Sequence, residues 1–257
     1  NPNVTSEKTL FALESAKEMV LSAYSESLSE IASQLSISNK IMPLSEKNFM
    51  TLNEIIRKRS GDPESLIRRN PNETFRQALT AMNQCLDDGR YKYVNDFIAD
   101  LKTIEASLHS IGAVNISEKL VRPLRWQASV FGFSAHTLDV RQNSEVVTRV
   151  LANIWSAVGT LSEPGSESWL KQIKTELVQQ NLPILDKSKL NEETLELISL
   201  LELILKVQNG PDPEAVGPFI LSMTRSAADI LSVLLLARYA GFGSEKLSLK
   251  VVPLFET

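Results

Sequence analysis

The sequence contains a single cysteine, Cys85, among its 257 residues. An intramolecular disulfide is therefore impossible, and a metal site built from several thiolates is excluded. Glycine and proline are also few, at 10 and 11 residues, which disfavours an all-β architecture with many tight turns. These absences favour a globular fold with a large helical content.

An excess of positive charge and a long apolar run are also missing. The chain has 27 Lys and Arg against 31 Asp and Glu, a net charge of -4, which argues against a nucleic-acid binder but allows a local anion pocket. The longest apolar run, residues 230–237, is interrupted by Ser232 and followed by Arg238, so we expect no membrane partner. The N-terminus has no signal-peptide pattern and does not begin with Met, so we expect a chain cut from a longer one.

Helical periodicity dominates residues 1–125. Steps of three and four between apolar residues predict a long first helix, and three more amphipathic helices follow it. We expect Phe49 on the inner face of the second helix and Asn72 as the N-cap of the third. The predicted helices cover residues 5–35, 46–58, 73–86 and 95–111.

Residues 126–257 mix predicted helices with about three strands. Leu138 and Val140 alternate with polar residues in a strand that ends near Arg141, and 219–223 is a short apolar run typical of a buried strand. A third strand is predicted over 247–256, with Pro253 at a bulge or near its end. The spacing of Ser226 and Asp229 predicts a capping box. Helices are predicted over residues 144–158, 169–180, 192–207 and 227–240.

Polar residues stand at the carboxyl ends of all three predicted strands, where active sites of parallel α/β folds gather. Arg141 could hold a phosphate or carboxylate through its planar fork, and Glu256 could bind Mg²⁺. A buried salt bridge from Asp139 or Glu256 to Arg141 is the more common arrangement at such spacing.

The histidines, the cysteine, the tryptophans and two basic clusters are expected to have structural roles. His109 and His136 have no partner at metal-ligand spacing and are expected to be hydrogen-bonded structural histidines. Cys85 is expected in or near the core. Three tryptophans are expected in packing, and two basic clusters on solvated faces. These residues are Trp126, Trp155, Trp169, Arg57-Lys58-Arg59 and Arg122-Pro123-Leu124-Arg125.

Four segments of the chain carry a family resemblance, in the family's order and at similar separations. They read FGFSAHTLDVRQNS at 131–144, ILSMTRSAADIL at 220–231, VPLFET at 252–257 and NPNVT at 1–5. They resemble the F-G-x-x-x-x-x-L-D-I-R-Q-E-S, I-S-M-x-x-S-x-S-D-V-L, A-P-L-F-E-T and D-R-D-G-N-P-N-V-T segments of phosphoenolpyruvate carboxylase. The resemblance extends end to end, although 36–125 and 159–215 match only in helical character.

The resemblance implies a fold that is mainly α with a few parallel strands, part of a helix-rich (β/α)8 TIM-type barrel. It implies a cytoplasmic, homotetrameric lyase that joins phosphoenolpyruvate and bicarbonate into oxaloacetate and phosphate with Mg²⁺ or Mn²⁺. Arg141 would grip the substrate phosphate, and Glu256 would be one metal ligand. Asn143 stands where the family has Glu, which removes a charge beside Arg141. Gln142 and Ser144 belong to the motif without an assigned chemical role.

The same resemblance places other functional segments outside this chain. The T-A-H-P-T-E segment with the catalytic histidine would precede residue 1, and the G-Y-S-D-S segment with the second metal carboxylate would follow residue 257. We therefore assign no catalytic residue within the chain. We expect 1–257 to be a single segment of a larger catalytic domain, inactive by itself. The alternative is a non-catalytic helical interaction or assembly module, suggested by the share of amphipathic helix.

Overall fold

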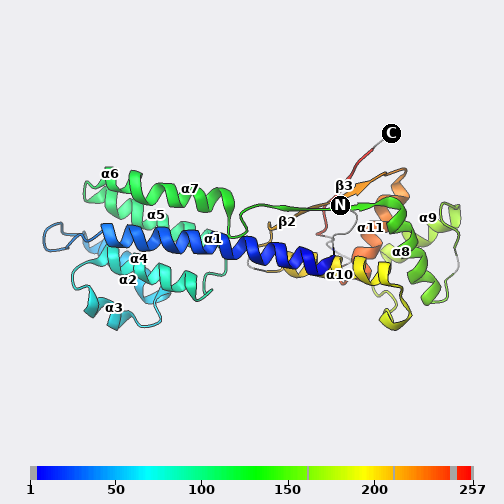
Figure 1. The fold of residues 1–257 in the computed structure, drawn as a ribbon, viewed down its shortest axis with the longest axis horizontal. Coiled ribbons are helices and arrows are strands. Elements are labelled where there is room, and N and C mark those ends of the chain that lie inside the picture. The colour runs from blue at the N-terminus through cyan, green and yellow to red at the C-terminus, as the bar shows by residue number, and fades with distance from the viewer. Residues whose placement is uncertain (1–4, 161, 211, 244–247, 256–257) are drawn as a thin grey trace. The chain divides into compact units, whose positions relative to one another are not determined.

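The computed structural model describes residues 5–160, 162–210, 212–243 and 248–255, and the chain forms two compact units. Residues 14–136 form the first, here called the helical unit. The described parts of 1–13 and 137–257 form the second, here called the sheet unit. The long first helix, α1 (Ser6–Gln34), begins in the sheet unit and continues in the helical unit (Figure 1).

The helical unit is built from amphipathic helices around one apolar core. Its core includes the fully buried Leu28, Ile56, Phe75 and Phe97, so each long helix contributes to it. Local signals set several ends: Ser45 caps the second helix, and Gly112 adopts a φ of 78° just after the fifth. The elements after α1 are α2 (Glu46–Arg59), α3 (Pro63–Arg69), α4 (Thr74–Asp87), α5 (Val94–Ser110), α6 (Val114–Ile116), the π-helix η1 (Ser117–Val121) and α7 (Arg122–Phe131).

The expectations for Asn72 and Phe49 in the helical unit are wrong. Asn72 has a φ of 66° and precedes Glu73, which occupies the N-cap position of α4. The tight turn at residues 70–72 therefore uses the tolerance of Asn for the left-handed region. Phe49 lies on the outer side of α2 and is 45% exposed, because Leu52, Ile55 and Ile56 already form the buried stripe of that helix.

The segment from 114 to 131 is a helix that the periodicity did not predict. A π-helical turn at η1 shifts the helical phase, and α7 then buries Leu124 and Ala128. Trp126, expected in packing, is 58% exposed because it lies on the opposite side of α7 from those residues. Val130 and Phe131, a β-branched and an aromatic residue of the kinds enriched in strands, belong to α7.

Contrary to the expectation from the sequence, the basic cluster on α2 does not lie wholly on a solvated face. Arg59 is only 5% exposed, and its Nε donates to Asp100 Oδ2 at 2.6 Å. Its guanidinium also lies 4.2 Å from the ring centroid of Tyr91. Tyr91 donates to the same carboxylate oxygen at 2.7 Å, so the buried charge is paired and hydrogen-bonded instead of solvated.

The sheet unit contains a three-stranded parallel sheet in the order β1-β2-β3. The third strand is much shorter than predicted, and Pro253 ends it, as expected for a residue without an N–H. The elements are β1 (Leu138–Asn143), α8 (Ser144–Ala157), α9 (Glu167–Val178), the 3₁₀ helix η2 (Lys187–Lys189), α10 (Glu192–Gln208), β2 (Val216–Ser222), α11 (Ala227–Tyr239) and β3 (Val251–Pro253).

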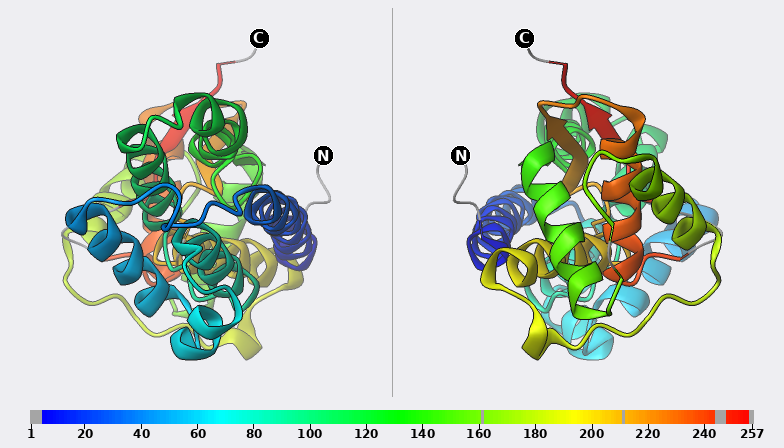
Figure 2. Two further views of the ribbon diagram at one scale, coloured as in Figure 1. Left: turned by 90° about the vertical axis from the view of Figure 1, so that its left-hand side faces the viewer. Right: turned by 90° about the vertical axis from the view of Figure 1, so that its right-hand side faces the viewer.

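Helices cover one face of this sheet. Val140, Phe219 and Leu221 are buried in a core shared with α8, α10 and α11. The right-hand view of Figure 2 shows α8 and α11 side by side next to the strands. The next cross-strand row joins Arg141 to Ile220 and Ile220 to Val252. Because side chains alternate along a strand, this row faces away from the helices, and Arg141 and Val252 are exposed.

The apolar run on α11 is explained by burial inside the sheet unit. Val233, Leu235 and Leu236 are almost fully buried, and the buried Arg238 stands in the last turn. Across the described residues, none of the helices combines the length and the apolarity needed to cross a membrane. The overall result is a mainly helical chain with a few parallel strands, as predicted.

Candidate site at the carboxyl ends of the strands

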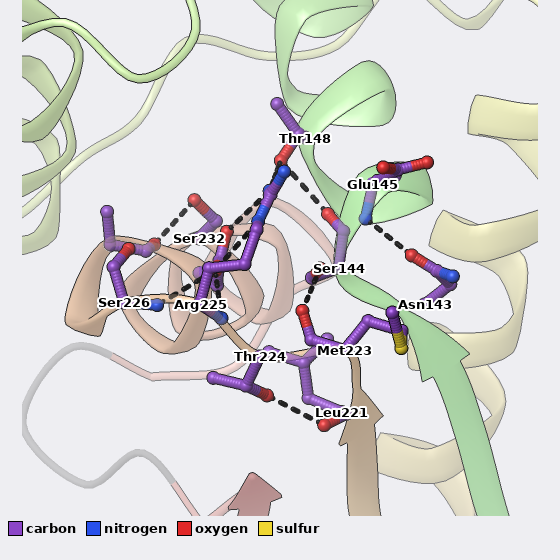
Figure 3. A network of polar contacts seen from close by, with 12 residues as sticks. Asn143, Ser144, Glu145, Thr148, Leu221, Met223, Thr224, Arg225, Ser226 and Ser232 are labelled. Carbon is purple, nitrogen blue, oxygen red and sulfur yellow. Dashed lines mark hydrogen bonds and ion pairs between the residues drawn. The ribbon is translucent and has the colours of Figure 1, made fainter. Parts of the chain in front are cut away.

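The parallel register brings two of the sequence motifs together at one edge of the sheet. Asn143 at the end of β1 is the register partner of Ser222 at the end of β2. The Ser144 hydroxyl donates to the carbonyl oxygen of Met223 at 2.7 Å. Ser222 Oγ donates in the opposite direction, to the carbonyl oxygen of Gln142, at 3.2 Å. Residues about 80 positions apart in the chain thus form one polar network. Figure 3 shows the bond between Ser144 and Met223.

Arg141 lies two residues before the end of β1 with its side chain exposed. Its guanidinium forms no hydrogen bond or ion pair with any other described residue. Asp139 is also exposed, so the expected alternative of a buried Asp139–Arg141 salt bridge is wrong. The guanidinium is accordingly free of any described carboxylate.

Asn143 has a structural role that the sequence comparison with the family motif did not suggest. Its side-chain oxygen accepts from the backbone N–H of Glu145 at 2.8 Å, which makes it the N-cap of α8. Its own N–H donates to Gln142 Oε1 at 2.8 Å. The junction between β1 and α8 is therefore fixed by the side chains of the two residues that follow Arg141.

The junction between β2 and α11 is held by a capping box and an ion pair. Ser226 and Asp229 form both bonds of the predicted box. Asp229 also accepts from the backbone N–H of Arg225 at 2.9 Å and from its Nη2 at 3.0 Å. Burial opposes ionisation of Asp229, but these bonds outweigh it and lower the pKa of the carboxyl. Arg225 Nη2 lies 3.5 Å from Thr148 Oγ1 on α8, which links the two helix starts.

Met223, the residue between β2 and this junction, has an unusual backbone. Its φ is 56°, in the left-handed region that favours glycine. The next residue, Thr224, donates its N–H to Leu254 O at 3.2 Å and its hydroxyl to Leu221 O at 2.7 Å. The turn after β2 therefore connects to the residue that follows β3 as well as to α8.

Sequence reasoning found Arg141 and placed Met223 at the end of the second strand. It did not predict the ion pair between Arg225 and Asp229, because an Arg before a capping box is ordinary in sequence. It did not predict the left-handed backbone of Met223 either, because no local signal in the sequence marks such a methionine. His109 and His136 are exposed and donate no side-chain hydrogen bond to the described residues, contrary to expectation, whereas Cys85 is buried as expected.

A pocket of about 320 Å³ adjoins the Arg225–Asp229 pair, with Thr148 and Trp169 on its other sides. Arg141 does not line it. Within the described residues, no group of three or more His, Cys, Asp or Glu could hold a metal ion. Glu256, the predicted metal ligand, lies outside the described residues.

The family model and the curated relatives that match this chain all point to one family. The model of the family described as phosphoenolpyruvate carboxylase matches residues 1–257. The chain is similar to the phosphoenolpyruvate carboxylase of Methylorubrum extorquens, with 31% identity over 281 aligned residues, and to that of Roseiflexus castenholzii, with 30% over 282. Both alignments take in 100% of this chain. The chain spans 30% of the length of each of these curated relatives.

Proposed function

The chain belongs to the phosphoenolpyruvate carboxylase family, and we propose that it contributes the Arg141 strand end to the substrate site of a lyase. The proposed reaction joins phosphoenolpyruvate and bicarbonate to give oxaloacetate and phosphate. The observation that carries the proposal is the exposed Arg141 guanidinium, free of described carboxylates, at the carboxyl end of a parallel strand. Ligands of open α/β sheets and barrels bind at that end.

The chemistry of the substrate fits this position. Phosphoenolpyruvate carries a phosphate and a carboxylate, and a guanidinium fork binds either group through two parallel hydrogen bonds. A fixed cation also stabilises negative charge that develops on the substrate as the phosphate leaves. Arg141 would act by binding and orienting the phosphate, with no proton transfer of its own.

The arrangement of the sheet supports a barrel in the complete protein. Three parallel strands carry helices on one face, while the row of Arg141, Ile220 and Val252 faces away from those helices. In a (β/α)8 barrel the helices lie outside and such a row points inward. We propose that these strands form part of a helix-rich barrel of this type.

A divalent ion, Mg²⁺ or Mn²⁺, belongs to the proposal only through the family resemblance, with Glu256 as one ligand. When bound, such an ion would neutralise charge on the substrate. The described residues offer no metal-binding cluster by themselves. The role proposed for Arg141 is direct contact with the substrate phosphate, and it is tested without the ion. A cytoplasmic location and a homotetrameric parent enzyme also rest on the resemblance alone.

The binding role can be tested on the chain itself. Isothermal titration with phosphoenolpyruvate and with inorganic phosphate would compare the wild type with Arg141→Gln. Loss of a charged bidentate contact should weaken binding by about tenfold or more. Arg57→Gln, which removes an exposed arginine from the helical unit, is the matched control and should leave the affinity unchanged. Equal affinities for all three proteins would overturn the assignment.

Catalysis is tested separately. A coupled assay for oxaloacetate on the 257-residue chain should show no turnover, because a guanidinium alone supplies no proton transfer. Metal-dependent turnover above background would show that the chain contains catalytic groups that we have not assigned.

A helical interaction module is the second candidate. Trp126 and Val130, 58% and 74% exposed, lie one turn apart on α7 and favour contact with another surface. This candidate predicts no anion binding through Arg141. It also predicts self-association, measurable by sedimentation velocity, that Trp126→Gln abolishes.

A further inference from the structure

Ser144 belongs to the same motif as Arg141 but has no assigned chemistry. It is the first residue of α8 and is completely buried. Serine at a helix start usually caps the helix, but here Asn143 does so. The Ser144 hydroxyl is instead directed across the sheet edge to the carbonyl oxygen of Met223, as Figure 3 shows.

The acceptor of this bond is the residue with the left-handed backbone. A methionine with a φ of 56° persists only where surrounding contacts hold it, because the conformation is unfavourable for a residue with a side chain. The Met223 side chain is 45% exposed and supplies little packing. The hydrogen bond from Ser144 is therefore a principal contact that fixes the Met223 carbonyl.

A second hydrogen bond joins the ends of β1 and β2, with the donor now on β2. Ser222 Oγ donates to the carbonyl oxygen of Gln142, the residue directly after Arg141. Thr148 Oγ1 donates to the carbonyl oxygen of Ser144 at 2.9 Å and lies 3.5 Å from Arg225 Nη2. The hydroxyl groups of Ser144 and Ser222, both in motif segments, thus join the ends of β1 and β2 in both directions.

We propose that Ser144 is a positioning residue for anion binding: it holds the turn after β2 against the end of β1 and so fixes where Arg141 presents its guanidinium. This inference rests on the proposed function. Without the hydroxyl, the Met223 carbonyl loses its donor, and the turn can leave its left-handed conformation. Arg141 itself keeps its charge, so affinity would fall through misplacement of the guanidinium.

Ser144→Ala and Ser232→Ala form a matched pair of variants. Ser232 is also buried and also donates its hydroxyl to a carbonyl, that of Ala228 at 2.8 Å. Its bond lies within α11 and joins neither β1 nor the turn after β2. Both variants lose one buried hydroxyl–carbonyl bond, so both should lose similar stability. Ser144→Cys fills almost the same space with a weaker donor and replaces Ser144→Ala if that variant does not fold.

Two measurements on the whole 257-residue chain decide the matter: the Kd of inorganic phosphate, and hydrogen exchange of the amides around Arg141 and Met223. Ser144→Ala should weaken phosphate binding about fivefold and increase exchange in both segments. Ser232→Ala should leave the affinity within about twofold of wild type. Equal loss of affinity in both variants, or none in either, would overturn the proposal.

Failure of the proposed function gives a different result. If the wild-type chain binds no phosphate, the role proposed for Arg141 is wrong. Hydrogen exchange still tests whether the Ser144–Met223 hydrogen bond holds the two segments together. Faster exchange around both Arg141 and Met223 in Ser144→Ala alone would support the positioning role of the serine. Unchanged exchange would contradict it.

Discussion

Replacing Asp229 by Asn should destabilise the sheet unit more than any ordinary surface change. The carboxylate is 6% exposed and stands in the first turn of α11. It accepts hydrogen bonds from the backbone N–H groups of Arg225 and Ser226, at 2.9 and 3.1 Å, and from Arg225 Nη2 at 3.0 Å. Asn keeps the shape of the side chain but loses its negative charge. Its NH₂ group, a donor, replaces one of the two oxygens that accept these hydrogen bonds.

The magnitude follows from these contacts. A charge-assisted hydrogen bond contributes about 1.5–3 kcal/mol, and an N-terminal capping interaction about 0.5–2 kcal/mol. The ion pair itself adds at most about 1 kcal/mol, because the Arg225 side chain is 56% exposed and water screens it. Asn retains one acceptor oxygen, so we expect a net loss of about 2 kcal/mol in the free energy of unfolding.

The lowered pKa of Asp229 determines how the stability difference between wild type and Asp229→Asn changes with pH. Because the folded-state pKa of Asp229 lies below the unfolded value of about 3.9, its contribution is complete above that pH and disappears as the pH falls through the folded pKa. The stability difference between wild type and Asp229→Asn should therefore be constant near neutral pH and narrow below about pH 4.

Urea unfolding followed by circular dichroism at pH 7, 5 and 3 measures both effects. Asp139→Asn, which changes an exposed carboxylate at β1, is the control and should stay within about 0.5 kcal/mol of wild type. A loss below about 0.5 kcal/mol for Asp229→Asn, or a gap that is as large at pH 3 as at pH 7, would refute the reasoning.

Three further predictions concern the helical unit and the buried tyrosines. Asp100→Ala should cost about 3–5 kcal/mol because it leaves the buried Arg59 unpaired, whereas Asp88→Ala, at an exposed ion pair, should cost under about 1 kcal/mol in the same urea experiment. Ala135→Gly should raise stability by about 0.5–1 kcal/mol, since Ala135 has a φ of 66°, and a lower urea midpoint would contradict this. Burial, together with Asp100 beside Tyr91 and Glu176 beside Tyr239, raises the pKa of both phenols, so the stability of the folded chain should fall as the pH rises above about 10. Absorbance at 295 nm should show these two tyrosines ionising only when the chain unfolds. Reversible ionisation of all tyrosines in the folded chain would contradict this prediction.

Much of the secondary structure could be predicted because its signals are local. The periodicity of the first 35 residues predicted α1 to within a residue at each end, and the Ser226–Asp229 spacing predicted the box that begins α11. The alternation of Leu138 and Val140 predicted β1, although the strand extends to Asn143. In each case the signal comes from the spacing of residues that are two to four positions apart in the chain.

Features that depend on distant residues could not be predicted in this way. Arg59 has the same sequence context as any solvated basic cluster, and only Asp100, 41 positions later, determines its burial. The π-helical turn at η1 displaced the helical phase, so no simple period indicated α7 or the exposure of Trp126. The mutual approach of Ser144 and Met223, 79 positions apart, follows from the parallel register of β1 and β2.

Asn143 shows how the sequence and the structure together change an interpretation. By resemblance to the family motif, Asn in place of Glu is a lost charge beside Arg141. In the structure its side chain caps α8, a role in which Asn is among the preferred residues and Glu is not. The substitution therefore exchanges a negative charge for a better helix start. Because no described carboxylate then pairs with Arg141, its positive charge remains available to an anionic ligand, which is the property that the proposed function requires.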